Sequence, residues 1–140
     1  MASFSHLKKL EVTQESTTEF TFYDIDGAPT LICRPATEAN PAYLNALLKE
    51  NGQLKKDRKK IVIDQGMLDI VRQQDRRIFP EANIVGWYDV VDDTGESVPF
   101  SKEAAQEFIS FLPDWLFDKL RAHLNQPKNF IIDSEEKGKN

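Results

Sequence analysis

The fold is decided by the stretch from Glu19 to Arg34, EFTFYDIDGAPTLICR. Its first five residues alternate apolar and polar side chains, as in a strand with one buried face, and the run from Thr30 to Arg34 has the composition of a second strand. Asp24 to Gly27 lie between the two, and Gly27 can adopt the positive φ that a tight turn requires. These features predict an antiparallel β-hairpin over residues 19–34.

Two helices are predicted after the hairpin. Asn40 can accept hydrogen bonds from the free amides of a helix start, and Pro41 at the first helical position loses no hydrogen bond. Asn51-Gly52 is typical of a helix end, so the first helix is expected over 41–51. The second, over 62–79, has apolar residues at helical spacing and is expected to stop at Pro80.

A second strand-like unit follows. Residues Ile84 to Val91 are apolar and β-branched, and Asp92 to Gly95 form a predicted turn. Val98 to Phe100 would then be a return arm, which Pro99 restricts to a short or edge position because it cannot donate a ladder hydrogen bond.

The last third of the chain predicts two more helices, over 102–112 and 114–125. Ser101 is positioned to cap the first, and Pro113 to start the second. The inner face of the second is expected to hold Trp115, Leu116, Leu120 and Leu124.

Together these elements predict an α+β fold, a mostly helical single domain with an N-terminal β-hairpin and, as one interpretation, a second short hairpin. Residues 1–18 are expected to form an N-terminal arm, 19–132 the domain, and 133–140 a mobile polar tail that contributes little to folding.

Length and composition suit one intracellular domain. The chain has 140 residues and one cysteine, Cys33, which excludes an internal disulfide and a cysteine-based zinc site of its own. The first twelve residues, MASFSHLKKLEV, lack the apolar core of a signal peptide, and no apolar run approaches the ~18 residues of a membrane span. We therefore expect a soluble cytoplasmic protein.

The net charge of −5 is unevenly distributed along the chain. Residues 1–78 hold 12 Lys and Arg against 11 Asp and Glu, whereas residues 79–140 hold 6 against 12. The acidic half argues against a nucleic-acid partner. The basic run Lys55–Lys60 is interpreted first as a solvated linker, with a contact site for an acidic partner as the alternative.

No residue pattern indicates catalysis, a metal or a cofactor. His6 and His123 lack metal-ligand spacing, and Cys33 lies in a predicted strand, where a core position is expected. The acidic turns at 24–27 and 89–93 lack the ligand order of a calcium loop. We expect no enzyme, although a carboxylate pair such as Asp92 and Asp93 in an apolar pocket would keep that alternative open.

Aromatic residues are concentrated in the last third: Trp87, Tyr88, Phe100, Phe108, Phe111, Trp115 and Phe117. Trp115 and Phe117 are two positions apart, which is about 200° around a helix. A bent helix pair that places both in the core is the preferred interpretation, and the alternative is that one ring faces outward as a protein-binding anchor. The predicted protein-binding site centres on Phe111, Trp115 or Phe117.

Three stretches resemble the tail assembly chaperones of long-tailed bacteriophages. The first runs from FTFYDIDG (20–27) to LICRPATEANPAY (31–43), and the second is VGWYDVVDDTGESVPFS (85–101). The third is the predicted helix 102–112 followed by PDWLF (113–117), closing near Asn129-Phe130. The order and spacing of these phrases cover most of residues 20–130.

The resemblance implies a function that the residues alone do not reveal. Such chaperones coat the tape-measure protein in the host cytoplasm, help to recruit tail tube protein, and leave before the virion is complete. It implies the tape-measure protein, the tail tube protein and a second copy of the chain as partners, with no catalytic residues and no cofactor. The alternatives are a structural tail component such as a completion protein, a nucleic-acid-associated regulator that uses Lys55–Lys60, and a small hydrolase.

Overall fold

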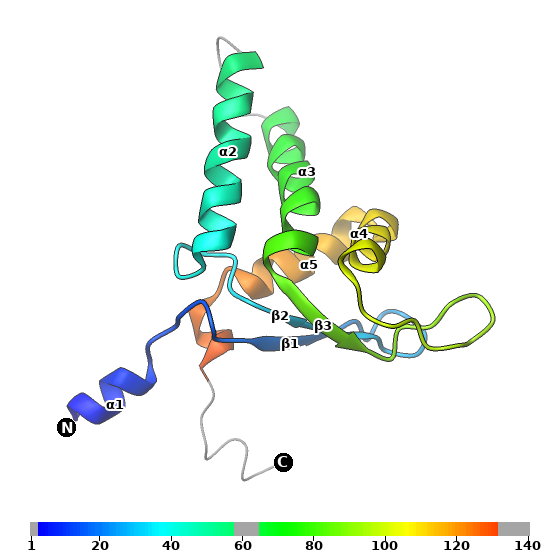
Figure 1. Cartoon of the computed structure of the whole chain (residues 1–140), viewed down its shortest axis with the longest axis horizontal. Helices are drawn as coiled ribbons and strands as arrows, with labels where there is room; N and C mark the ends of the chain where they lie inside the picture. Colours follow the sequence, from blue (N-terminus) through cyan, green and yellow to red (C-terminus); the bar gives the residue numbers. More distant parts are fainter. Residues whose placement is uncertain (1–2, 58–64, 132–140) are drawn as a thin grey trace.

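The structure is a computed structural model that describes residues 3–57 and 65–131 (Figure 1). It confirms the predicted α+β class. The elements in chain order are α1 (Phe4–Lys9), β1 (Thr18–Thr21), β2 (Thr30–Cys33), α2 (Pro41–Asp57), α3 (Gln65–Ala82), β3 (Ile84–Tyr88), α4 (Lys102–Phe111), α5 (Asp114–Leu124) and a short 3₁₀ helix (Pro127–Phe130).

The predicted N-terminal hairpin is present. Strands β1 and β2 pair antiparallel with Phe20 opposite Leu31 and Thr21 opposite Thr30. Gly27 has a φ of +85° in the connecting turn, as expected from its lack of a Cβ.

The second strand unit completes the sheet, and the segment after it turns back on itself over only a few residues. β3 pairs antiparallel with β2, so the strand order is β1-β2-β3. The predicted return arm is not a strand: Val91 and Ser97 form one isolated bridge, and the N–H of Val98 donates to the carbonyl of Val90. The pairing ends at Val98, directly before Pro99.

Helices α2 to α5 lie on one side of the sheet, whereas α1 stands apart at one end of it (Figure 1). The core lies between the sheet and α3, α4 and α5. Its largest fully buried apolar side chains are Phe22, Phe79, Phe117, Leu31, Ile109, Leu120 and Leu124. An antiparallel sheet covered on one face is a common solution for a domain of this size.

The first predicted helix is longer than expected. Asn40 caps α2 as predicted, since its Oδ1 accepts from the N–H of Ala42 at 3.2 Å. However, Asn51-Gly52 does not end the helix, which continues to Asp57. The neighbouring helix supports this region, because the side-chain amide of Gln74 on α3 donates to Asn51. Contact between helices thus offsets the low helix propensity of glycine.

The prediction that Pro80 stops the next helix is also wrong, because α3 extends to Ala82. Pro80 removes one backbone hydrogen bond, but the N–H of Asn83 still donates to the carbonyl of Phe79 at 3.0 Å. Phe79 and Pro80 are both fully buried, so packing against the core holds the last turn in place.

Parts of three predictions lie outside the described residues. They are the start of the predicted helix 62–79, residues 58–60 of the basic run, and the polar tail 133–140.

Candidate functional site

The three aromatic residues singled out in the sequence lie at the corner between α4 and α5, but only two of them are at the surface. Phe111 is 78% exposed and Trp115 is 55% exposed, whereas Phe117 is fully buried. The interpretation that placed both Trp115 and Phe117 in the core is therefore wrong, and so is the inward position predicted for Trp115. The alternative, with one ring facing outward, is correct.

Helical periodicity explains the difference. The buried residues of α5 are Leu116, Phe117, Leu120 and Leu124. These share one face, and Trp115 lies about 200° from Phe117 on the other side of the axis. The ring of Phe117 packs against Phe79, with their centroids 5.4 Å apart, and the guanidinium of Arg76 lies 4.8 Å above it. Phe117 is thus a core residue and does not contribute to an exposed surface.

Arg76 of α3 also fixes the corner itself. Its guanidinium donates to the backbone carbonyls of Ile109 at 2.6 Å and Leu112 at 2.9 Å. These carbonyls belong to the end of α4, where few helical amides remain to donate to them; from the backbone, the carbonyl of Ile109 accepts the long bond from the N–H of Leu112 at 3.3 Å. The corner that presents Phe111 and Trp115 is therefore tied to the core of the domain.

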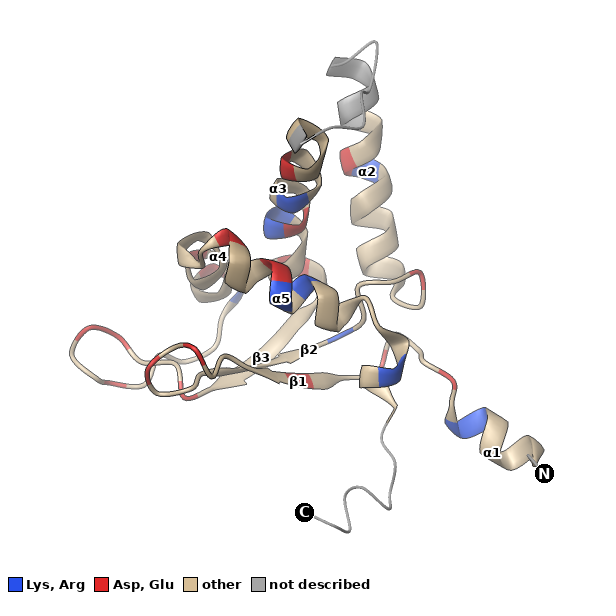
Figure 2. Cartoon of the chain, turned by 180° about the vertical axis from the view of Figure 1, so that it is seen from behind, with Lys and Arg blue, Asp and Glu red and all other residues tan. Residues whose placement is uncertain are grey.

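A groove of about 550 Å³ lies beside Phe111, between α4 and the segment that follows β3. We call it the Phe111 groove. Its lining residues are Trp87, Val90, Val91, Asp92, Asp93, Val98, Ala104, Glu107, Phe108 and Phe111. The lining combines apolar side chains with three carboxylates and contains no Lys or Arg. Figure 2 shows acidic residues on the loop after β3, at the end of the sheet opposite α1.

The acidic rim of the groove is held in place by its own turn. The carboxylate of Asp92 accepts hydrogen bonds from the N–H and hydroxyl of Thr94 and from the N–H of Glu96. These bonds, the Thr94 hydroxyl first, lower the pKa of Asp92. Gly95, with a φ of +87°, closes the turn that the sequence predicted. Asp92 therefore keeps its negative charge at neutral pH, and a basic ligand is favoured beside it.

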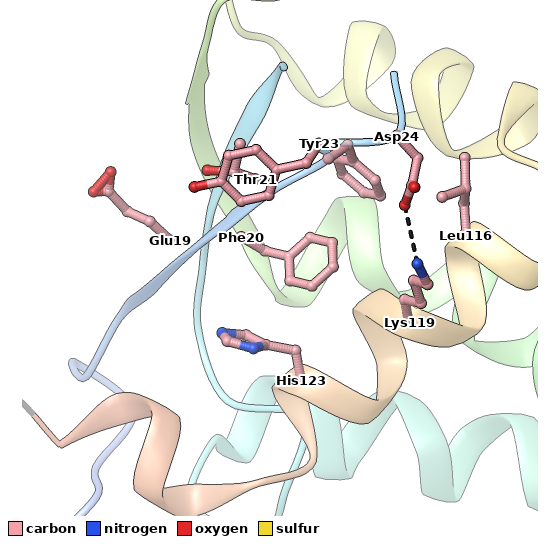
Figure 3. Close-up of a pocket in the computed structure, with 9 residues that line it drawn as sticks. Glu19, Phe20, Thr21, Tyr23, Asp24, Leu116, Lys119 and His123 are labelled. Carbon is pink, nitrogen blue, oxygen red and sulfur yellow. Dashed lines mark hydrogen bonds and ion pairs between the residues drawn. The ribbon is translucent and has the colours of Figure 1, made fainter. Parts of the chain in front are cut away.

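Trp115 borders a different part of the surface. The ammonium of Lys119, one turn along α5, lies 5.2 Å from the centre of its ring, and the same ammonium is 3.0 Å from Asp24. Lys119, Asp24, Phe20 and His123 line a second cavity of about 520 Å³ between β1 and α5 (Figure 3). In that cavity the Nε2 of His123 lies 3.0 Å from the hydroxyl of Thr18.

The residues considered for catalysis are dispersed. His6 lies on α1 and His123 on α5, and Cys33 is buried in β2, where burial raises the pKa of its thiol. Within residues 3–57 and 65–131, no group of three or more His, Cys, Asp or Glu is placed to hold a metal ion. The lowered pKa of Asp92 is opposite to the shift that acid catalysis would need.

The apolar half of the groove was not predicted from the sequence. The sequence predicts a strand through Val90 and Val91, but β3 ends at Tyr88, Val91 is exposed, and both valines line the groove beside Phe111. One sequence feature could have predicted their exposure: the two valines stand directly before an acidic turn. Such a turn breaks the strand and leaves neighbouring apolar side chains uncovered.

The comparisons with known proteins give no relative. No protein-family model matches the chain, and neither the curated proteins nor the solved structures yield a match. In the part of the chain that the structure describes, no helix is sufficiently long and apolar to span a membrane.

Proposed function

We propose that this protein is a tail assembly chaperone of the kind found in long-tailed bacteriophages, and that it binds the tape-measure protein through the Phe111 groove. The observation that carries the proposal is the ring of Phe111, 78% exposed beside an apolar groove with an acidic rim. Exposed aromatic rings are common binding anchors. A basic amphipathic helix fits such a groove, with its apolar face inward and its charges at the rim.

The sequence resemblance supplies the identity of the client. A tape-measure protein is long, helical and prone to aggregate, so its chaperone needs many weak contacts that the assembling tube can displace. A shallow groove with one exposed ring provides such a contact. In this proposal the protein acts in the host cytoplasm, helps to recruit tail tube protein and is absent from the finished virion.

Co-expression with the tape-measure protein tests the proposal. Phe111→Ala and Trp115→Ala should reduce co-purification of the client, with the larger loss for Phe111 because its ring lines the groove. Leu48→Ala is a matched control, since Leu48 is a similarly exposed apolar residue on α2 and does not line the groove. Retention of the client by a folded Phe111→Ala protein would show that the groove is not the client site, and the basic run Lys55–Lys60 would be tested next.

Two further observations separate this function from its alternatives. A reading frame for a tape-measure protein directly downstream of the gene would support the chaperone. Mass spectrometry of purified virions should not find the protein, and its presence there in stoichiometric amounts would favour a structural tail component instead.

A further inference from the structure

The N-terminal helix α1 is amphipathic, and its apolar face is not covered. Phe4, Leu7 and Leu10 are spaced three residues apart, so they lie along one side of the helix. They are 86%, 50% and 42% exposed, respectively, and no residue of α1 is buried. Phe4 thus has the largest exposed fraction among the exposed large apolar side chains of the described chain.

The polar residues of α1 are basic. His6, Lys8 and Lys9 occupy its last turn, and its first turn holds no acidic residue. Ser3 caps the helix, because its hydroxyl accepts from the N–H of His6 at 3.1 Å. A six-residue helix is too short to be stable alone in water, so packing against another surface would stabilise it.

The Phe111 groove is complementary to α1. It offers apolar side chains to the stripe of Phe4, Leu7 and Leu10, and the carboxylates of Asp93 and Glu107 to Lys8 and Lys9. Opposite charges at a rim favour encounter and fix orientation. Both surfaces are present on every copy of the chain.

The two surfaces of one copy cannot meet. Figures 1 and 2 place α1 and the loop after β3 at opposite ends of the sheet. Val12, three residues after the end of α1, packs against the core, so the arm cannot swing to the other end. The partner must therefore be a second molecule.

We propose that α1 of one copy docks in the Phe111 groove of a second copy. The contact joins two different surfaces, which permits either reciprocal exchange of arms or head-to-tail growth. A short helix buries less than the roughly 1,600 Å² of a standard interface, so the association is weak and readily displaced. A client helix would compete with the arm for the same groove.

A complementation experiment tests this contact in the full-length chain. Leu7→Asp disrupts the arm and leaves the groove intact, whereas Phe111→Asp disrupts the groove and leaves the arm intact. Both positions are exposed, so both variants should fold. In sedimentation velocity, the unaltered chain should self-associate, and each variant alone should do so about tenfold or more weakly. A mixture of the two variants should form a one-to-one complex, because it contains one intact arm and one intact groove.

Charge reversal supplies a second test. Lys8→Glu with Lys9→Glu should weaken association, and mixing this chain with one carrying Asp93→Lys and Glu107→Lys should restore it. Added salt should weaken the contact between unaltered chains.

Tryptophan fluorescence can detect binding in the groove. The chain has two tryptophans, so Trp115→Phe leaves Trp87, which lines the groove, as the single fluorescent indole. In a Trp115→Phe, Leu7→Asp chain, a synthetic peptide of residues 1–12 should change the emission of Trp87. The same peptide with Leu7→Asp should have no effect.

Three results would overturn the proposal: an unaltered chain that stays monomeric, a mixture of the two aspartate variants that stays monomeric, or self-association that neither variant weakens. None of these three results tests whether the protein binds the tape-measure protein. Leu7→Asp should still bind the tape-measure protein, and loss of client binding in Phe111→Ala is measured separately. The arm contact and the proposed function can therefore fail independently.

Discussion

The guanidinium of Arg76 on α3 lies 2.7 Å from the carboxylate of Asp114, the first residue of α5. The same guanidinium donates to two carbonyls at the end of α4, so one side chain joins three helices. An arginine can make this arrangement because its planar group carries five donors in a fixed geometry. The relationship explains how a corner with two exposed aromatic rings is held firmly on a small domain.

Arg76→Ala should therefore lower the free energy of unfolding by about 2–3 kcal/mol, because hydrogen bonds from a charged group to partly buried acceptors are lost. Urea unfolding followed by circular dichroism measures the change. Arg77→Ala is the matched control on the same helix: the side chain of Arg77 is 58% exposed against 13% for Arg76, and its ion pair with Glu50 should contribute less than about 1 kcal/mol. Equal losses in the two variants would mean that Arg76 has no special role at the corner.

Replacing each of the three aromatic residues of the corner with alanine should destabilise the protein to different extents. Phe117→Ala removes a fully buried ring and should cost about 3–5 kcal/mol. Phe111→Ala and Trp115→Ala alter exposed rings and should cost no more than about 1 kcal/mol. Chemical denaturation of the three purified variants gives the comparison. A cost at Phe111 as large as that at Phe117 would contradict the exposed position of Phe111.

Stability should fall in mildly acidic solution because of His123. Burial lowers the pKa of this imidazole below its ordinary value of about 6.5. The unfolded chain then binds the proton more readily than the folded chain, so stability is intact above about pH 6.5 and decreases as the pH falls below it. His123→Gln should remove this part of the pH dependence.

Urea midpoints measured between about pH 8 and pH 5 test the effect of His123. The same substitution at the exposed His6 is the control and should leave the pH profile of the parent chain unchanged. If the profile of His123→Gln also matches that of the parent, His123 is not the source of the dependence.

The thiol of Cys33 should be protected from chemical labelling in the folded protein. It is fully buried, and burial raises its pKa, so both access and thiolate formation are suppressed. A thiol reagent should react at least about a thousandfold more slowly than with the urea-unfolded chain, since only unfolded molecules expose the sulfur. Rapid labelling without urea would show that β2 is open to solvent.

Local sequence signals predicted the α+β class, the first hairpin and the caps of α2 and α4. The cap that Asn40 forms with Ala42, the cap of Ser101 and the turn at Gly27 each involve residues within four positions, so a local pattern is enough to predict them. The ends of α2 and α3 were predicted less well. Gly52 and Pro80 are unfavourable in isolated helices, but contacts from α3 and from the core override that preference.

The sequence by itself determined which residues could form a binding surface: a cluster of aromatic side chains in an acidic half of the chain. Only the tertiary structure decided that Phe111 and Trp115 face solvent while Phe117 fills the core. The acidic turn at 92–95 comes to lie beside Phe111 because β3 pairs with β2 and α4 packs back over the sheet. Pairing between residues more than fifty positions apart sets that geometry, and no local pattern encodes it.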